Sequence, residues 1–168
     1  MPIPDRPVAN TTIDSAWGQA VHDYTFAPTG CDLGSTVGQT VSAALAHLRL
    51  DVANEDPAGF LVGGGAYEAE VPTDADGLYI VGLNINFVNG DAGTSSRGYL
   101  FINGSSYAAD TVENRGGTNV QAMISTPVPL TAGDILQCWA ERLSAGTNPT
   151  VKVNYLRLLR VGAEYGGV

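Results

Sequence analysis

Few residues of this chain have side chains suited to catalysis. The two histidines are His22 and His47, and neither lies in a recognisable catalytic motif. A catalytic triad is assembled in space rather than along the sequence, so the sequence alone leaves a triad open. A structural or solvent-exposed histidine is the commoner role for each residue. We therefore predict a protein that is not an enzyme.

Two turns carry oxygen ligands that could bind calcium. Asp74 and Asp76 lie in one turn, and Asn89 and Asp91 lie in another. Calcium takes roughly six to eight oxygen ligands, and neither pair has the spacing of an EF-hand loop. Ordinary turn carboxylates are the favoured interpretation. No metal or other cofactor is predicted, while a calcium ion in a loop stays open.

The cysteines and a run of glycines add no catalytic signal. Cys31 and Cys138 form no CxxC motif, and we expect two free, partly buried thiols, although a disulfide between them stays open. The glycines at 63–65 precede a strand and lack the Lys-Ser/Thr pair of a phosphate-binding loop.

One tryptophan is a candidate for sugar binding. Trp139 could act as a flat platform for a sugar ring. Its neighbours Leu136, Cys138 and Ala140 instead favour a packed face of a sheet, and we predict the packed face.

The composition excludes some partners. The net charge is −9, and Lys152 is the only lysine among eight basic residues. An acidic chain without a basic stripe is a poor candidate for binding nucleic acid, because phosphates require clustered cations. Charged residues make up 15% of the chain, against about 25% in ordinary soluble domains. Neighbouring subunits could cover much of the surface, or a sheet surface of Thr, Ser and Asn could explain the deficit.

Membrane insertion is not expected. Residues 1–7 contain three prolines and no apolar core of a signal peptide, and no apolar run has the length of a membrane span. We expect a soluble protein made in a cytoplasm.

The other elements are organised around a strand at 77–89. Its odd-numbered positions are β-branched, aliphatic or aromatic, which predicts a core face of Tyr79, Val81, Leu83, Ile85 and Phe87. The opposite face begins with Leu78 and Ile80 and continues with Gly82 and Asn84. Since Leu78 and Ile80 also need cover, we expect this strand to be contacted on both faces.

The N-terminal residues predict an arm. After the extended, proline-rich start, an apolar stripe at helical spacing predicts a short helix, with Thr11 or Thr12 as its N-cap. The stripe consists of Ile13, Trp17, Val21 and Tyr24. It either packs on its own domain or docks into a larger assembly. Residues 27–39, rich in Gly, Pro, Thr and Ser, are interpreted as a linker.

Short strands separated by turns fill the rest of the chain. From Ala46 onward, Leu48, Leu50 and Val52 alternate as in a strand, and 60–62 is a candidate edge strand. Asn103-Gly104 is a strong hairpin signal, because both turn positions favour positive φ. Further strands are expected at 67–71, 99–102, 106–112, 120–125, 135–140 and 151–161. This spacing predicts an all-β, antiparallel sandwich or jelly roll.

Three segments resemble a known family. Residues 72–81 (PTDADGLYIV) resemble the entry to the third core strand of tumour necrosis factor-like and complement-globular-head jelly rolls. Residues 128–136 (VPLTAGDIL) resemble their L-x-x-G-D turn, and 156–159 (LRLL) resemble their last strand. The resemblance covers residues 44–162. The arm, with IPDR at 3–6 and SAWGQAV at 15–21, is similar to the start of virion structural proteins of tailed bacteriophages.

The resemblance implies a homotrimer with one sheet of each subunit facing the threefold axis. The core face named above would fill the sandwich, and the positions facing the axis would be Leu78, Ile80, Gly82 and Asn84. It also implies three regions: an arm and linker at 1–40 that anchors the protein to other virion proteins, a jelly roll at 41–162 and a tail at 163–168.

The function implied is that of a non-enzymatic phage virion protein. The leading hypothesis is a trimeric jelly roll at the tail tip, whose loops (residues 90–97, for example) contact the host surface. The alternatives are a capsid decoration protein and a free carbohydrate-binding module. The expected location is the virion, after synthesis in the host cytoplasm.

Overall fold

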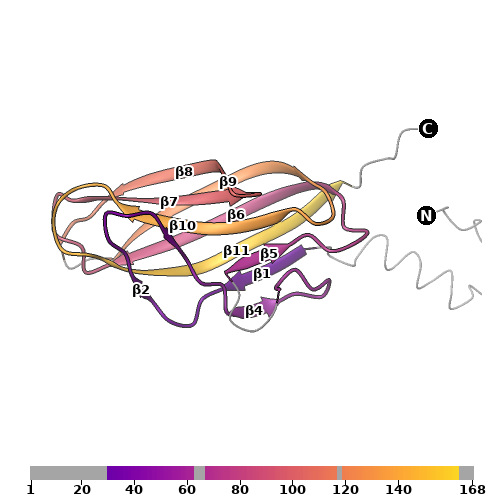
Figure 1. Cartoon of the computed structure of the whole chain (residues 1–168), viewed down its shortest axis with the longest axis horizontal. Coiled ribbons are helices and arrows are strands. Elements are labelled where there is room, and N and C mark those ends of the chain that lie inside the picture. The colour runs from indigo at the N-terminus through magenta and orange to yellow at the C-terminus, as the bar shows by residue number, and fades with distance from the viewer. Residues whose placement is uncertain (1–29, 63–66, 117–118, 163–168) are drawn as a thin grey trace, which may run out of the picture.

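Two antiparallel sheets pack face to face in the computed structural model, which describes residues 30–62, 67–116 and 119–162 (Figure 1). The six-stranded sheet has the order β4-β1-β11-β6-β9, with β2 also paired to β11. The five-stranded sheet has the order β3-β10-β7-β8, with β5 also paired to β10. The strands are β1 (Gly30–Gly34), β2 (Gln39–Thr40), β3 (Ala46–His47), β4 (Val52–Glu55), β5 (Glu68–Glu70), β6 (Gly77–Val88), β7 (Ser95–Ile102), β8 (Ser105–Glu113), β9 (Val120–Leu130), β10 (Ile135–Arg142) and β11 (Thr150–Gly162).

The core lies between the sheets and is organised around β6. β6 pairs with β11 on one side and with β9 on the other along most of its length. The predicted core face is confirmed, because its members are all buried: Tyr79, Val81, Leu83, Ile85 and Phe87. The buried Tyr79 hydroxyl donates to the Ala75 carbonyl at 2.5 Å, which satisfies its polar group. The ring of Phe60 meets that of Tyr79 edge-on at 6.1 Å.

The sheets approach each other closely at one glycine of β7. A Cβ atom at Gly98 would lie 2.8 Å from Cδ1 of Ile85 and 3.1 Å from Cβ of Ala122. A glycine inside a strand commonly marks such an approach. The core at this point therefore has no room for a larger residue.

The linker expected over residues 27–39 is wrong for 30–34, whereas 35–38 lie outside any strand. Gly30–Gly34 forms β1, which pairs with both β11 and β4. Leu33 is fully buried in this strand, and its partner on β11 is Leu156. A five-residue strand rich in glycine carries little periodic signal. Its stability comes from a partner far along the chain.

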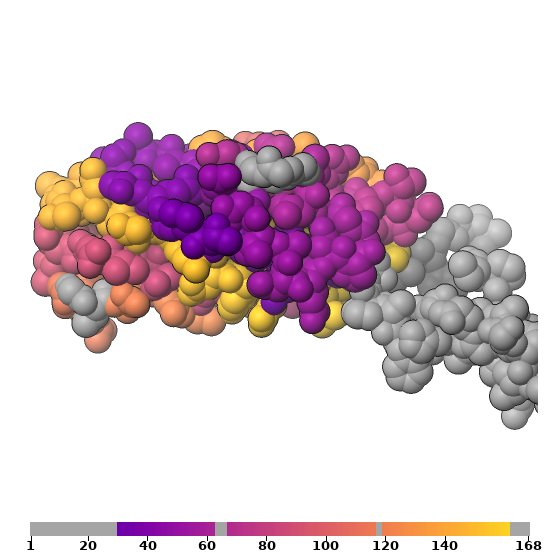
Figure 2. All heavy atoms as spheres, turned by 90° about the horizontal axis from the view of Figure 1, so that it is seen from below, coloured from indigo at the N-terminus to yellow at the C-terminus, as the bar shows by residue number. Residues whose placement is uncertain are grey.

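The strand expected from Ala46 to Val52 is also only partly correct. Ala46–His47 forms β3 and Val52–Glu55 forms β4, whereas Leu48 and Leu50 lie between them and are buried. The reason is that this segment changes sheets, since β3 pairs with β10 and β4 with β1. Figure 2 shows the segment of 34–62 spread over one side of the sandwich. At 60–62 the expected edge strand is reduced to one bridge, from Leu61 to Ala69.

The remaining strands form where they were expected, but β7 begins at Ser95, inside the loop expected at 90–97, and β9 continues past Ser125 to Leu130. Asn103 and Gly104 have φ angles of 51° and 74°, as the predicted hairpin requires. Pro127 and Pro129 lie within β9, which is an edge strand and so tolerates residues without an N–H group.

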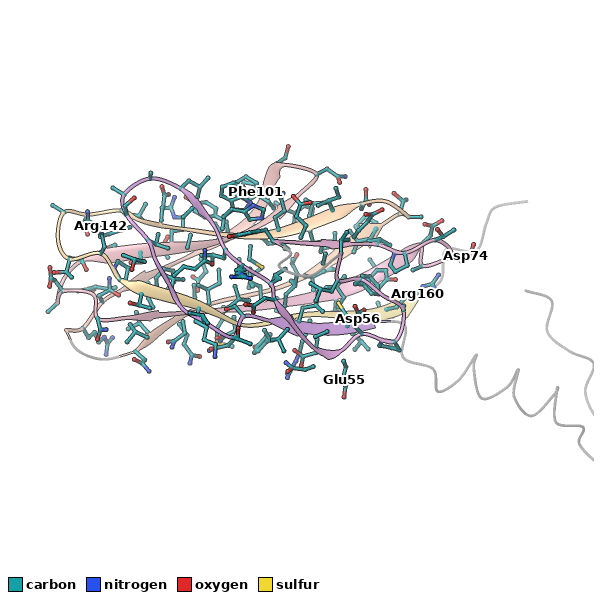
Figure 3. All side chains as sticks on the ribbon, turned by 60° about the horizontal axis from the view of Figure 1, so that its bottom comes forward. Glu55, Asp56, Asp74, Phe101, Arg142 and Arg160 are labelled. Atoms are coloured by element: carbon teal, nitrogen blue, oxygen red, sulfur yellow. The ribbon has the colours of Figure 1, made fainter. Side chains whose placement is uncertain are left out.

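The two ends of the sandwich hold different parts of the chain. Gly30 pairs near Leu159, so the described chain enters and leaves at one end, where Asp74 and Arg160 also lie (Figures 1 and 3). Arg142 lies at the opposite end, next to the loop that follows β10 (Figure 3). The arm stripe of Ile13, Trp17, Val21 and Tyr24, together with His22 and the tail at 163–168, lies outside the described residues.

Candidate functional site

The outer face of the six-stranded sheet exposes large apolar side chains. On β6, Leu78 is 42% exposed and Ile80 is 37% exposed, although their neighbours in sequence are buried in the core. β9 adds Met123, which is 59% exposed, and β11 adds Leu159 and Val161, which are 54% and 51% exposed. We name these five residues the apolar face. Exposed apolar side chains gathered in one place indicate an interaction surface.

Strand register brings these side chains together. Ile80 pairs with Leu159 on β11 and with Pro127 on β9, and Leu78 pairs with Pro129. A hollow in this face is lined by Ile80, Gly82, Met123, Ile124, Ser125, Tyr155, Arg157 and Leu159. Three of the predicted positions, Leu78, Ile80 and Gly82, therefore lie in or beside one apolar surface.

Leu159 was not predicted from the sequence because of a β-bulge in β11. The register of β11 against β6 shifts between Val153 and Tyr155. Before the bulge Val151 and Val153 point to the core, and after it Leu156 and Leu158 do so. An inserted residue reverses which parity faces the core. The change from VKV to LRL in the sequence of β11 is the signal that could have revealed it.

Asn84, the fourth predicted position, is only 3% exposed within its own chain. Its Nδ2 donates to Oε1 of Gln121 at 3.0 Å, and its Oδ1 accepts from Nδ2 of Asn154 at 2.7 Å. Both groups of its amide are thus satisfied inside the protomer. A substitution at Asn84 is expected to affect the protomer itself before it affects any surface contact.

Charged groups border the apolar face on one side. Arg157 Nε donates to Oδ2 of Asp32 at 2.7 Å, and its guanidinium lies 4.5 Å from the centroid of the Tyr155 ring. These contacts position the Arg157 side chain beside the hollow. The arrangement of apolar centre and polar border is typical of protein interfaces.

Neither a protein-family model nor a curated protein matches the sequence. Solved structures do match the described fold. The globular domain of zebrafish complement 1qA has a TM-score of 0.63 at 7% identity, and the match covers 82% of this chain and 99% of that one. The chain has a tumour necrosis factor-like, complement-globular-head jelly roll.

Two further structures have the same jelly roll. Murine APRIL at pH 5.0 has a TM-score of 0.56 at 10% identity, with 80% of this chain and 99% of that chain covered. Eiger TNF from S. frugiperda has a TM-score of 0.53 at 14% identity, with 84% and 97% covered. At such identities the likeness shows the fold alone. It confirms the fold expected from the three resembling segments.

The candidate catalytic and metal-binding residues of the jelly roll make local structural contacts. His47 Nε2 lies 2.8 Å from the Tyr67 carbonyl oxygen, and its ring stacks on Trp139 at 4.4 Å. Asp76 Oδ1 accepts from the Ala132 N–H at 2.5 Å. Asp91 Oδ2 accepts from the Thr147 N–H at 2.6 Å, and this hydrogen bond lowers the pKa of Asp91.

The described residues contain neither a cluster suited to a metal ion nor a helix suited to a membrane. No group of three or more His, Cys, Asp or Glu side chains in 30–62, 67–116 and 119–162 is placed to hold a metal ion. Within the same ranges, no helix has the length and apolar character needed to cross a membrane.

The packed face predicted around Trp139 is wrong in one respect. Leu136, Cys138 and Ala140 are indeed buried in the core. Trp139 alternates with them and therefore lies on the opposite, outer face of the five-stranded sheet. There it contacts the rings of His47 and Phe101.

Both cysteines are expected to resist thiol reagents in the folded protein. Cys31 and Cys138 are free and buried, and burial raises the pKa of each thiol. Because the thiolate is the reactive form, Ellman's reagent should label neither residue at pH 8 and both in denaturant. Cys31→Ala should leave one thiol in denaturant and none in buffer. Rapid labelling of the native protein would contradict the described burial.

Proposed function

We propose that this chain forms a homotrimer through the outer face of the six-stranded sheet and serves as a non-enzymatic structural protein of a phage virion. The observation that carries the proposal is the apolar face. Its five side chains are each 37% to 59% exposed in the single chain, and β6, β9 and β11 hold them in one surface. Covering them would remove apolar area from water at about 25 cal/mol per Å².

The threefold arrangement is supported by the jelly roll. The family resemblance implies trimers with one sheet toward the axis, and the sheet with the exposed apolar side chains is the one that contains β6. A polar surface in this place would have argued against the arrangement. We therefore propose Leu78, Ile80 and Gly82 as interface positions, with Met123 and Leu159 added by the structure.

The absence of enzymatic activity is supported by the contacts of the candidate groups. His47 is occupied by a ring stack and a backbone oxygen, and Asp76 and Asp91 cap backbone N–H groups. Neither thiol of the jelly roll is exposed, since Cys31 and Cys138 are both buried.

The virion location is supported by the arm and by the geometry of the sandwich. We propose that residues before the jelly roll anchor the trimer to other virion proteins through Ile13, Trp17, Val21 and Tyr24. The described chain begins at one end of the sandwich, and the loops near Arg142 lie at the other (Figure 3). An anchored trimer would present those loops outward, toward a host surface.

Immunogold labelling of purified particles is the direct test of location. Gold at the tail tip would support the leading proposal, and gold spread over the head would favour a capsid decoration protein. Particles without gold, from a lysate that contains the protein, would contradict a virion role. In that case a free carbohydrate-binding module becomes the better hypothesis.

Deletion of residues 1–24 is expected to abolish attachment to particles without unfolding the trimer. The apolar stripe would be lost, while the described sandwich from Gly30 onward would be kept. Three arms on one trimer act together, so weak individual contacts give tight attachment. Co-sedimentation with particles and circular dichroism measure the two properties.

Trp17→Ala tests the same stripe with a single change. It should weaken co-sedimentation and leave the melting temperature of the free trimer unchanged. If Trp17→Ala instead lowers that melting temperature, the stripe packs on its own domain and the anchor proposal fails.

A further inference from the structure

A row of five rings crosses the outer face of the five-stranded sheet, on the side opposite the apolar face. The rings are consecutive neighbours, and their centroids are 5.1, 4.4, 5.3 and 5.9 Å apart. We name this the aromatic row, and in order it consists of Tyr67, His47, Trp139, Phe101 and Tyr99. Phe101 marks it in Figure 3, midway along the sandwich and on the far side from Glu55.

Strand pairing assembles the row from distant parts of the chain. Trp139 on β10 lies opposite His47 on β3 and opposite Tyr99 on β7. The residues that alternate with Trp139 and Tyr99 are in the core, so both rings point outward. Tyr67 is 40% exposed, and the other four rings are partly exposed. The row is therefore an accessible surface and not an extension of the core.

Hydrogen-bonding side chains flank the rings and are held in place. Gln137 Nε2 donates to Glu68 Oε1 at 2.5 Å, and Trp139 Nε1 donates to Gln137 Oε1 at 3.3 Å. On the other side, the Tyr99 hydroxyl donates to Glu141. Each carboxylate keeps lone pairs that these bonds do not use. Side chains fixed in advance lose little freedom when a ligand binds.

The charge of this surface selects against anionic ligands. Glu68 and Glu141 flank the rings, and Arg97 is bound to Thr111 at 2.8 Å and to the Tyr99 hydroxyl at 3.5 Å. Burial lowers the pKa of His47, which disfavours the charged form of its ring. The carboxylates would repel phosphates, sulfates and uronic acids, and no cluster of cations among the named side chains would offset this repulsion.

A ligand that fits must offer apolar C–H groups to the rings and hydroxyl donors to the carboxylates and the amide. Sugars have both on one small frame: C–H groups on the faces of the ring and hydroxyls around its edge. We propose that the aromatic row, with Glu68, Gln137 and Glu141, binds a neutral oligosaccharide. This goes beyond the proposed function, because it concerns the other sheet and requires neither the trimer nor the virion.

The test uses the full chain and follows Trp139 directly. The chain has two tryptophans, so Trp17→Phe leaves Trp139 as the only indole reporter. Maltohexaose, cellohexaose and chitohexaose are titrated to about 10 mM, with hexagalacturonate as the charged comparison. We expect a saturable change in Trp139 emission with at least one neutral probe, the same affinity by calorimetry for the wild-type chain, and no binding of hexagalacturonate.

Substitutions then assign the binding to the row. Phe101→Ala and Glu141→Gln should each weaken binding at least tenfold, and the second keeps the shape of the side chain. Tyr107→Ala is the matched control, since Tyr107 is an exposed aromatic residue of β8 outside the row, and it should bind as the wild type does. Circular dichroism melting confirms that each variant is folded.

Three results would overturn the proposal. These are a lack of saturation with all three neutral probes, unchanged binding by Phe101→Ala and Glu141→Gln, and stronger binding of hexagalacturonate than of the neutral probes. If the wild-type chain binds no sugar and Trp139→Ala loses self-association, a second copy of the chain covers the row, and the sugar proposal is likewise overturned. Ile80→Asp protein should bind the sugar as the wild type does, so failure of the trimer and failure of sugar binding are distinguishable.

Discussion

Ile80→Asp is expected to convert the proposed trimer into folded monomers. Ile80 lies in the centre of the apolar face and is 37% exposed in the single chain, so the monomer tolerates a polar side chain there. In the trimer the same substitution would bury unpaired carboxylates around one axis. Each costs several kcal/mol, and about 1.4 kcal/mol is a tenfold change in an equilibrium constant. Sedimentation velocity at micromolar concentration measures the result.

The control for Ile80→Asp is Leu143→Asp. Leu143 is 41% exposed and follows β10 at the end of the sandwich marked by Arg142, outside the apolar face. It should leave the trimer intact. An unchanged trimer in Ile80→Asp would show that another surface makes the interface. A wild-type monomer would contradict the proposed function itself.

Phe87→Ala is expected to lower the free energy of unfolding strongly. Phe87 is fully buried on β6, between Val151 of β11 and Val120 of β9. Truncation of a buried phenylalanine costs about 3–5 kcal/mol, because transfer free energy is lost and a cavity remains. Urea denaturation at one fixed protomer concentration measures the change, since an oligomer's stability depends on concentration.

Tyr107→Ala provides the comparison for Phe87→Ala. Tyr107 is an aromatic residue of β8 that is 47% exposed, and its hydroxyl donates to the Pro127 carbonyl at 3.2 Å. Its loss should cost about 1 kcal/mol, as for one hydrogen bond on the surface. If Phe87→Ala costs no more than Tyr107→Ala, Phe87 does not lie between the sheets.

Local patterns were enough to predict the parts of the fold that depend on near neighbours. The alternation in 77–88 predicted β6 and its core face, because successive side chains of a strand point to opposite sides. Asn103-Gly104 predicted its hairpin, because these two residues accept positive φ. The same alternation left Leu78 and Ile80 without cover, and the structure places both on an exposed surface.

Only the tertiary structure decided the features that depend on distant partners. β1 is a strand because Leu33 pairs with Leu156, and the bulge of β11 makes Leu159 part of the apolar face. Trp139 gained its ring neighbours from β3 and β7. Pairing between strands far apart in the chain fixes which residues meet. A strand's own sequence carries its alternation but not the identity of its partner or the position of a bulge.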